Sequence, residues 1–175
     1  MNKKEITFKG KHLAFLLRHD KEAFDNRIID NEGWREISEL ISKQGYTKEL
    51  LDEIVETNNK KRYEYNNDKT KIRARQGHSI NVDVNLIESE PPETLYHGTS
   101  NDVVELIKND GIKKGRRLYV HLSKDKETAI NVGSRHGTPY IFTIDSKKMY
   151  NDGVKFYISR NGVWMTEFID PKYIK

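Results

Sequence analysis

Arg18 and His19 are the first residues of the chain whose types and spacing could do chemistry, because both directly follow an apolar helical run. An arginine guanidinium donates two parallel hydrogen bonds to a phosphate, and an imidazole can donate a hydrogen bond or move a proton near neutral pH. The pair also has a plain electrostatic interpretation, because cations are stabilised at the C-terminal end of a helix. Taken alone, the position favours the electrostatic interpretation over anion capture.

A second candidate segment carries two arginines and then breaks at a glycine. Arg73 and Arg75 lie on a strand-like stretch, and Gln76-Gly77-His78-Ser79 follows with three hydrogen-bonding side chains. The segment lies within residues 60–78, the basic stripe, which holds seven Lys or Arg and two Asp or Glu. Such a stripe is the expected footprint of a polyanion, and a solvated hairpin face is the alternative.

The second half of the chain places polar groups at the ends of short strands. His97-Gly98-Thr99-Ser100 ends one strand, where Gly98 permits a close backbone approach, and His121 and Ser123 lie in another. A histidine between apolar neighbours usually belongs to a core, but two strands with similar polar ends favour a shared pocket. A glycine-bracketed loop that presents Arg135 and a tight turn at 161–166 complete the set.

Three helices and a hairpin are expected to position the first two segments. Apolar residues recur at helical spacing over 7–19, with Thr7 as the N-cap, then up to Gly45, and again after a Thr47 cap. Strand-like pieces at 62–65 and 71–74 flank a typical turn sequence. This order is typical of a winged helix, a variant of the helix-turn-helix.

Residues 88–94 hold two of the four prolines and no hydrophobic side chain, which predicts a linker. Beyond it, strands are expected at 95–97, 118–122, 140–144, 154–159 and 163–166, with helices at 103–107 and 125–131. The strands follow one another too closely for βαβ crossovers. The predicted fold class is therefore α+β, with domains at 1–90 and 91–175.

The composition narrows the class of protein further. Of 175 residues, 35% are hydrophobic and 33% charged, none is Cys, and the net charge is +4. Without Cys there is no disulfide, thiolate zinc site or cysteine catalysis, and no P-loop, Rossmann or HExxH motif occurs. The longest apolar run has five residues and no secretion signal is visible. We expect a cytoplasmic monomer that uses neither membrane nor metal.

Six short motifs, taken in their order along the chain, together resemble those of a known family. They are Arg18-His19; Arg73-Ala74 with Gln76-Gly77-His78-Ser79; His97-Gly98-Thr99; Val120-His121-Leu122-Ser123; Gly133 with Arg135; and Asn161-Gly162-Val163-Trp164. Together they closely resemble the RNA 2′-phosphotransferase family, the Tpt1/KptA type, over about residues 8–169. The resemblance implies an N-terminal winged-helix lobe that binds RNA and a C-terminal lobe with the split β-sheet of ADP-ribosyltransferases.

The resemblance also implies a reaction and its residues. Family members transfer an internal RNA 2′-phosphate to NAD⁺, a co-substrate, releasing nicotinamide and then ADP-ribose 1″,2″-cyclic phosphate. The family's catalytic set maps onto Arg18, His19, Arg73 and Arg135. The implied nucleotide-binding residues are His97, Gly98, Thr99, Ser100, Gly111, His121 and Ser123. The partner would be RNA that carries a 2′-phosphate, with tRNA as one candidate.

Two other functions stay open at this point. One is an ADP-ribosyltransferase that acts on nucleic-acid ends or on protein; Val163, where such enzymes often carry Glu, argues against the protein version. The other is a winged-helix nucleic-acid binder without catalytic activity. It explains the basic stripe but leaves the polar segments of the second half without a purpose.

Overall fold

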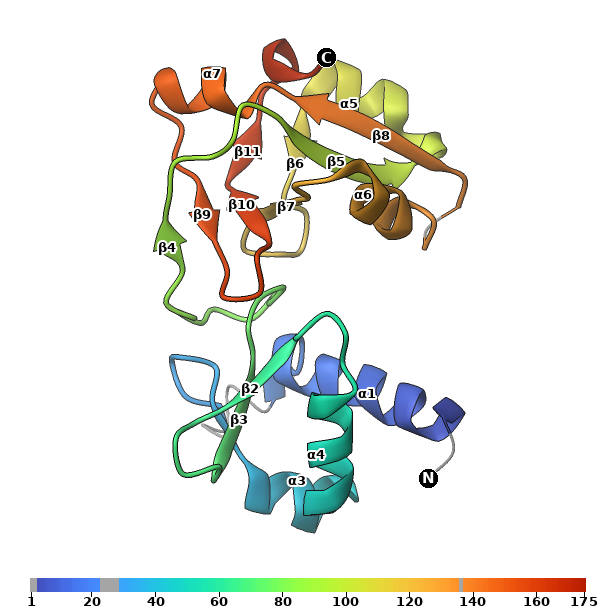
Figure 1. The fold of residues 1–175 in the computed structure, drawn as a ribbon, viewed down its shortest axis with the longest axis vertical. Helices are drawn as coiled ribbons and strands as arrows, with labels where there is room; N and C mark the ends of the chain where they lie inside the picture. Colours follow the sequence, from blue (N-terminus) through green and yellow to red (C-terminus); the bar gives the residue numbers. More distant parts are fainter. Residues whose placement is uncertain (1–2, 23–28, 136) are drawn as a thin grey trace. The chain divides into compact units, whose positions relative to one another are not determined.

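The computed structural model describes residues 3–22, 29–135 and 137–175, and the chain divides into two compact units (Figure 1). Unit 1 comprises residues 1–85 and unit 2 comprises residues 86–175. Each unit has its own hydrophobic core and contains both helices and strands. The α+β class expected from the sequence is confirmed.

The described helices of unit 1 pack around one apolar core. They are α1 (Lys3–Arg18), α3 (Ile37–Gln44) and α4 (Lys48–Glu56). Gly45, with φ +66°, ends α3, and the Thr47 hydroxyl caps α4 by accepting from the backbone N–H of Leu50 at 3.2 Å. Both helix boundaries match the prediction. The core that the helices share includes Leu13, Leu17, Leu40 and Leu51, all fully buried.

The predicted start of the first helix at Thr7 is wrong. The helix α1 begins at Lys3, and the Thr7 hydroxyl donates to the carbonyl oxygen of Lys3 at 2.8 Å, inside the first turns. Residues 3–6 contain neither Gly nor Pro, so no residue there prevents the helix from extending. A threonine can bond to a carbonyl one turn earlier, and its presence therefore does not require a helix start.

A small antiparallel sheet completes unit 1. Its strands, in spatial order, are β1 (Arg35–Glu36), β3 (Lys71–Ala74) and β2 (Tyr63–Tyr65). The strands β2 and β3 form the predicted hairpin, and their register sets Glu64 directly opposite Arg73. Ile72 and Ala74 of β3 are buried in the same core as the helices. The hairpin is therefore fixed to the body of the unit.

Unit 2 is built from short antiparallel strands. One sheet has the order β4 (Ile87–Glu88), β9 (Tyr157–Ile158), β10 (Trp164–Thr166) and β7 (Val120–Leu122). Two strand pairs stand beside it, β5 (Leu95–Ser100) with β8 (Pro139–Ile144), and β11 (Phe168–Ile169) with β6 (Ile112–Lys113). A bridge between Tyr96 and Ser123 joins β5 to the end of β7. The antiparallel pairing agrees with the predicted absence of βαβ crossovers.

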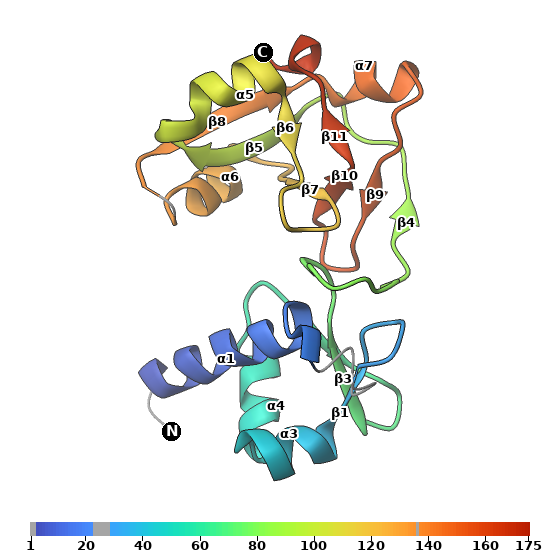
Figure 2. The same ribbon diagram turned by 180° about the vertical axis from the view of Figure 1, so that it is seen from behind.

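The helices of unit 2 cover the β5–β8 pair from two sides, as Figures 1 and 2 show for α5 and α6. The described helical segments are η1 (Asn101–Val103), α5 (Val104–Asp110), α6 (Lys126–Gly133), α7 (Ser146–Asn151) and η2 (Pro171–Tyr173). Asp125 caps α6 by accepting from the backbone N–H of Thr128 at 2.7 Å. The cap explains why the helix starts where the sequence predicts.

Two glycines allow α6 to lie directly against β5. A Cβ at Gly98 would lie 1.8 Å from the carbonyl oxygen of Ala129, and a Cβ at Gly133 would lie 2.7 Å from that of Thr99. Only glycine fits at such distances. The close approach expected at Gly98 is therefore made by a neighbouring helix. The helix α6 ends two residues before Arg135, whose backbone N–H donates to the carbonyl oxygen of Val132 at 3.3 Å, so the same packing holds the start of the loop that carries Arg135.

The linker predicted at residues 88–94 is part of unit 2. Glu88 belongs to β4, the Ser89 N–H donates to the carbonyl oxygen of Phe156 at 3.0 Å, and the Ser146 hydroxyl donates to that of Pro92 at 2.6 Å. The prediction was wrong because a polar, proline-rich segment can still be fixed through its backbone N–H and C=O groups, which the sequence pattern does not reveal.

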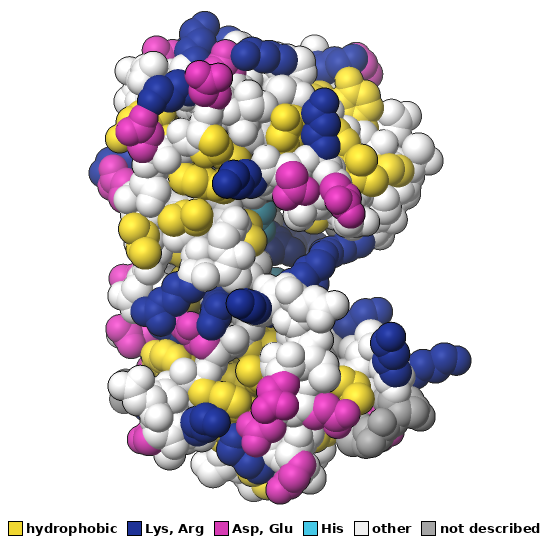
Figure 3. All heavy atoms as spheres, viewed as in Figure 1, with side chains coloured by type: hydrophobic (Ala, Val, Ile, Leu, Met, Phe, Trp, Pro, Cys, Tyr) yellow, Lys and Arg dark blue, Asp and Glu magenta, His cyan; other side chains and the backbone are white. Residues whose placement is uncertain are grey.

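On the face of the molecule drawn in Figure 3, acidic and basic side chains are interspersed.

Candidate active site

The end of α1 and the segment after β3 meet at Ser79. The backbone N–H groups of Ser79 and Ile80 donate to the carbonyl oxygen of Arg18 at 2.9 and 3.4 Å. The Ser79 hydroxyl lies 2.9 Å from Nδ1 of His19. The last carbonyls of a helix lack partners within it, and here the second segment supplies them. Two sequence motifs sixty residues apart thus come together as Arg18, His19 and Ser79, the α1-end cluster.

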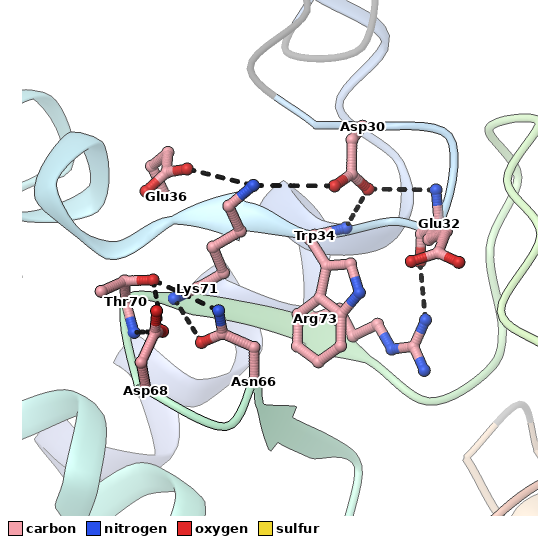
Figure 4. A network of polar contacts seen from close by, with 9 residues as sticks. All are labelled: Asp30, Glu32, Trp34, Glu36, Asn66, Asp68, Thr70, Lys71 and Arg73. Atoms are coloured by element: carbon pink, nitrogen blue, oxygen red, sulfur yellow. Dashed lines mark hydrogen bonds and ion pairs between the residues drawn. The ribbon is translucent and has the colours of Figure 1, made fainter.

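Arg73 is buried and held on several sides, with 2% of its surface exposed. Its Nε donates to Oε1 of Glu64 at 2.7 Å, and its Nη1 donates to the carbonyl oxygen of Glu32 at 3.1 Å. The guanidinium also lies over the Trp34 ring, 4.3 Å from its centroid (Figure 4). A buried guanidinium is costly unless it is paired, and these contacts both stabilise Arg73 and fix its direction.

The loop that carries Glu32 and Trp34 is itself anchored by Asp30. Its Oδ1 accepts from the backbone N–H groups of Glu32 at 3.0 Å and of Trp34 at 2.9 Å (Figure 4). Gly33, at φ +81°, makes the turn between them, in the left-handed region that glycine adopts most easily. The support of Arg73 thus extends from β2 to a loop that precedes β1.

The basic stripe is partly neutralised within unit 1. Lys71 lies 3.3 Å from Glu36 and 4.0 Å from Asp30, and Glu64 lies within 3.2 Å of Arg75 as well as beside Arg73 (Figure 4 shows the Lys71 contacts). The stripe is therefore not a uniform basic face. Arg73 on β3 and Arg75 after it form ion pairs inside the unit. These two arginines are therefore better described as side chains held in fixed positions than as part of a general polyanion-binding surface.

In unit 2, the two histidines predicted to share a pocket are neighbours. The His97 Nδ1–H donates to the backbone carbonyl oxygen of His121 at 3.1 Å, which leaves Nε2 of His97 as an acceptor. Burial lowers the pKa of His97, and the bond to His121 opposes that shift only in part. Tyr96 and Ser123 exchange backbone hydrogen bonds of 2.9 and 2.8 Å beside them. The ends of the two strands therefore lie side by side, and the shared pocket expected there stays a prediction.

Arg117 fixes the proton of His121. Its Nη1 lies 3.1 Å from Nδ1 of His121, and because an arginine can only donate, Nδ1 accepts and the proton of the neutral ring lies on Nε2. Although Arg117 is exposed as a whole residue, partial desolvation of its guanidinium, and then the nearby charge of Arg135, lower its pKa. Like charges held close together are typical of a place that binds an anion. His121 is half-buried, so the core interpretation of this histidine does not hold.

Three other residues predicted to bind the nucleotide have structural roles in unit 2. Ser100 caps η1: its hydroxyl oxygen accepts from the backbone N–H of Asp102 at 3.4 Å, and the hydroxyl donates to Oδ2 of Asp102 at 2.9 Å. Gly111, at φ +80°, ends α5, and a Cβ there would lie 2.2 Å from the carbonyl oxygen of Ile169. Thr99 pairs with Tyr140 in the β5–β8 ladder. Their binding of a nucleotide stays a prediction, as do the catalytic roles assigned to Arg18, His19, Arg73 and Arg135.

Sequence reasoning missed three residues that position these groups, namely Glu64, Ser79 and Arg117. A signal existed for the first, because a lone carboxylate between basic residues on a short strand often has a cross-strand partner. Ser79 lies in one of the six motifs, but the motif alone does not indicate what its hydroxyl contacts. Arg117 lies four residues before His121, outside any strand, and nothing in the pattern connected the two.

The described part of the chain shows neither a cluster of metal-ligating side chains nor a membrane-spanning helix. Within the described ranges, no three His, Asp or Glu side chains come together as a metal site would require. In the same ranges, no helix is long and apolar enough to span a membrane. Each unit thus carries arginine and histidine side chains at the ends of its helices or strands, and these are side-chain types that commonly hold phosphate groups in proteins.

Comparison with known proteins identifies the family. The family model described as "RNA 2'-phosphotransferase, Tpt1 / KptA family" matches residues 3–168. A "Probable RNA 2'-phosphotransferase" of Flavobacterium johnsoniae is 53% identical over 171 residues, which cover 95% of this chain and 93% of the relative. Proteins of the same name from Fusobacterium nucleatum and Escherichia coli are 49% and 43% identical, over 95% and 99% of this chain and 96% and 97% of the relatives. The chain belongs to this RNA 2′-phosphotransferase family.

Proposed function

We propose that the protein is an NAD⁺-dependent RNA 2′-phosphotransferase, which removes an internal 2′-phosphate from RNA. Family membership over nearly the whole chain supports the removal of a 2′-phosphate. The observation that carries the proposal is the α1-end cluster, in which Ser79 brings the Arg18-His19 motif to the motif that follows Arg73. We further propose that NAD⁺ is the co-substrate, that the reaction runs in two steps, and that Arg18, His19, Arg73 and Arg135 act on the phosphate.

Each unit is proposed to bind one substrate. Unit 1, with helices followed by a β-hairpin, would act as a winged-helix RNA-binding lobe, approximately residues 1–90. Unit 2, with its short antiparallel strands and paired histidines, would act as an ADP-ribosyltransferase-like lobe that binds NAD⁺. His97 offers an acceptor at Nε2 and His121 a donor at Nε2, which suits hydroxyl and amide groups of a dinucleotide.

In the first step, an oxygen of the RNA 2′-phosphate attacks the ribose carbon that carries nicotinamide. The carbon–nitrogen bond breaks and its electron pair leaves with nicotinamide, which is already a cationic leaving group. The residues of this chain have little proton transfer to perform here. The role proposed for Arg18 and Arg73 is to orient the phosphate through paired hydrogen bonds.

In the second step, the adjacent ribose 2″-hydroxyl attacks the phosphorus atom. The bond from phosphorus to the RNA 2′-oxygen breaks, the 2″-hydroxyl loses its proton and the RNA 2′-oxygen gains one, and the products are RNA with a 2′-hydroxyl and ADP-ribose 1″,2″-cyclic phosphate. Negative charge spreads over the phosphoryl oxygens, and arginines are the usual stabilisers of such charge. We assign that role to Arg18, Arg73 and Arg135. We assign to His19 either a hydrogen bond to the phosphate or a proton transfer, and its bond to Ser79 orients the imidazole ring for this role.

The test supplies the purified protein with a single-stranded oligonucleotide bearing one internal 2′-phosphate. With NAD⁺, we expect release of nicotinamide, 2′-hydroxyl RNA and the cyclic-phosphate product, all measurable by mass spectrometry. Loss of the phosphate without NAD⁺, or no loss with it, would overturn the proposal. Transfer of ADP-ribose that stays on the RNA end or on a protein would instead identify an ADP-ribosyltransferase.

Two variants test the residue roles. Arg18→Ala should lower turnover by roughly 10²–10³, the cost of losing one preorganised donor to a charged transition state. Ser79→Ala should lower it by roughly 3- to 10-fold, because one hydrogen bond that orients His19 is lost. Ser89→Ala is the matched control, since that hydroxyl makes only a local bond to the Ile87 carbonyl oxygen. Full activity in Arg18→Ala would contradict the assignment while leaving the family membership intact.

A further inference from the structure

One face of α1 is exposed and combines aromatic with basic side chains. At 100° per residue, Lys4, Phe8, Lys11 and Phe15 fall within about 60° of one another on the helix circumference. The opposite side carries the buried Leu13, Leu16 and Leu17 of the core. We name the four-residue surface the α1 outer face.

The two phenylalanines of this face are unusually open to solvent. Phe8 is 70% exposed and Phe15 is 53% exposed, the former the highest fraction among the exposed large hydrophobic residues described. Lys4 and Lys11 are exposed on either side of Phe8. In Figure 3, Lys and Arg side chains project from the region of unit 1 where Figure 1 draws α1. Exposed apolar side chains that gather on one face and are bordered by polar residues often mark a binding site.

The face leads directly to the α1-end cluster. The rings of Phe15 and His19 have their centroids 6.3 Å apart and are tilted by 47°. From Phe8 to Phe15 the helix rises about 10 Å, which corresponds to about three nucleotides of a stacked strand. A strand whose phosphate lies at His19 could therefore extend along α1 and present two bases, about three nucleotides apart, to the two rings.

We propose that the α1 outer face binds the single-stranded RNA that flanks the 2′-phosphate, an inference that rests on the proposed function. The phenylalanine rings stack on unpaired bases, and the lysines contact the backbone phosphates. We choose single-stranded RNA as the partner because basic and aromatic residues alternate along this face. A protein partner or a second copy of the chain that covered the rings would also desolvate the ammonium groups between them, which costs free energy unless each finds an anion.

Binding of a fluorescent oligonucleotide to the full-length protein, measured by anisotropy without NAD⁺, tests the proposal. Phe8→Ala and Phe15→Ala should each weaken binding roughly 5- to 150-fold, the range measured when one base loses its stacking partner. Phe15→Leu should also weaken binding, because it keeps apolar bulk but removes the aromatic ring. Ile41→Ala is the matched control, since Ile41 is 42% exposed on another helix of the same unit, and it should bind as the parent protein does.

The salt dependence supplies a readout that a loss of folding would not reproduce. Lys11→Ala should reduce the slope of log K against log salt by about 0.7, the value for one phosphate contact on a single strand, whereas the phenylalanine variants should keep the parent slope. Lys43→Ala, which removes an exposed lysine paired with Glu39 on α3, should leave the slope unchanged.

Several outcomes would overturn the proposal. Unchanged RNA affinity in both phenylalanine variants would do so, as would equal affinity for the duplex form of the oligonucleotide. A change in oligomeric state with unchanged RNA binding would assign the face to a second copy instead. The proposed function fails separately: a protein that binds RNA through this face but releases no nicotinamide overturns that function and leaves the RNA-binding face standing.

Discussion

Glu64 holds Arg73 through a buried ion pair, with Oε1 of the carboxylate 2.7 Å from Nε of the guanidinium. Its second oxygen lies 3.2 Å from Nε of Arg75. The two residues of the ion pair are directly opposed across the β2–β3 hairpin, so the strand register creates the contact. One carboxylate thus positions an arginine to which we assign a catalytic role.

Removal of the Glu64 carboxylate should destabilise the fold. Glu64→Ala leaves the buried Arg73 guanidinium without its charge partner, and we expect the free energy of unfolding to fall by about 3–5 kcal/mol in urea titrations. Glu64→Gln keeps an acceptor but loses the charge and should cost less. Lys43→Ala breaks the exposed pair with Glu39 and should change stability by at most about 1 kcal/mol. Similar losses in Glu64→Ala and Lys43→Ala would contradict this account.

Loss of Arg117 should affect nucleotide binding more than folding. In Arg117→Ala, His121 loses the donor that keeps its proton on Nε2, and the cation beside Arg135 disappears. If unit 2 binds NAD⁺, its KM should rise roughly 10-fold or more, since a hydrogen bond from a charged donor is worth about 1.5–3 kcal/mol. Steady-state kinetics measure this change. Arg116→Ala, one residue earlier and exposed, is the control. A raised KM in the control alone would contradict the prediction.

The stability of unit 2 should depend on pH through His97. Burial lowers its pKa below the ordinary 6.5, so the unfolded chain takes up this proton first as the pH falls. The contribution of His97 to stability is therefore complete above pH 6.5 and declines as the pH falls from 6.5 toward the lower pKa of the folded state, by at most about 1.4 kcal/mol per pH unit.

Urea unfolding of the parent protein and of His97→Gln, across about pH 5 to pH 8, measures this dependence. Glutamine does not titrate, so the variant should lose less stability on acidification, and the difference between the two curves isolates His97. Parallel curves would show that the histidine has the same pKa in the folded and unfolded chains.

Two glycine-to-alanine substitutions should act in opposite directions. In Gly98→Ala the new methyl group would clash with the carbonyl oxygen of Ala129, and we expect a loss of at least about 2–3 kcal/mol. In Gly10→Ala, within α1, the nearest atom to the new Cβ is Cγ2 of Ile54 at 3.7 Å, an ordinary contact. Alanine there should stabilise the helix by roughly 0.5–1 kcal/mol. Thermal unfolding measures both, and a stabilising Gly98→Ala would contradict the packing of α6.

Elements with explicit start or stop residues were predictable from the sequence. Gly45, Thr47 and the hairpin turn each impose a local conformation, and the structure places helix and strand boundaries there. Elements without such residues were not. The start of α1 was misplaced at Thr7, and strands of two residues such as β1 and β6 are too short for alternation to show.

The candidate site was predictable as motifs but not as contacts. The meeting of Arg18-His19 with Ser79 depends on how α1 packs against β3, and the Glu64–Arg73 pair depends on strand register. Neither is encoded in the spacing of residues along the chain. The bond from Arg117 to His121 depends on the path of an irregular segment, for which no periodic pattern exists.

The strand β4 closes the outer edge of β9, where Ile87 pairs with Ile158 and Glu88 with Tyr157. A unit 2 produced alone from residue 91 would lack this strand and leave β9 with a row of unpaired backbone N–H and C=O groups. Open edges of that kind recruit strands from other chains and aggregate. The solubility of an isolated unit 2 therefore depends on β4, which the sequence alone places in the first domain, with Glu88 at the start of the predicted linker.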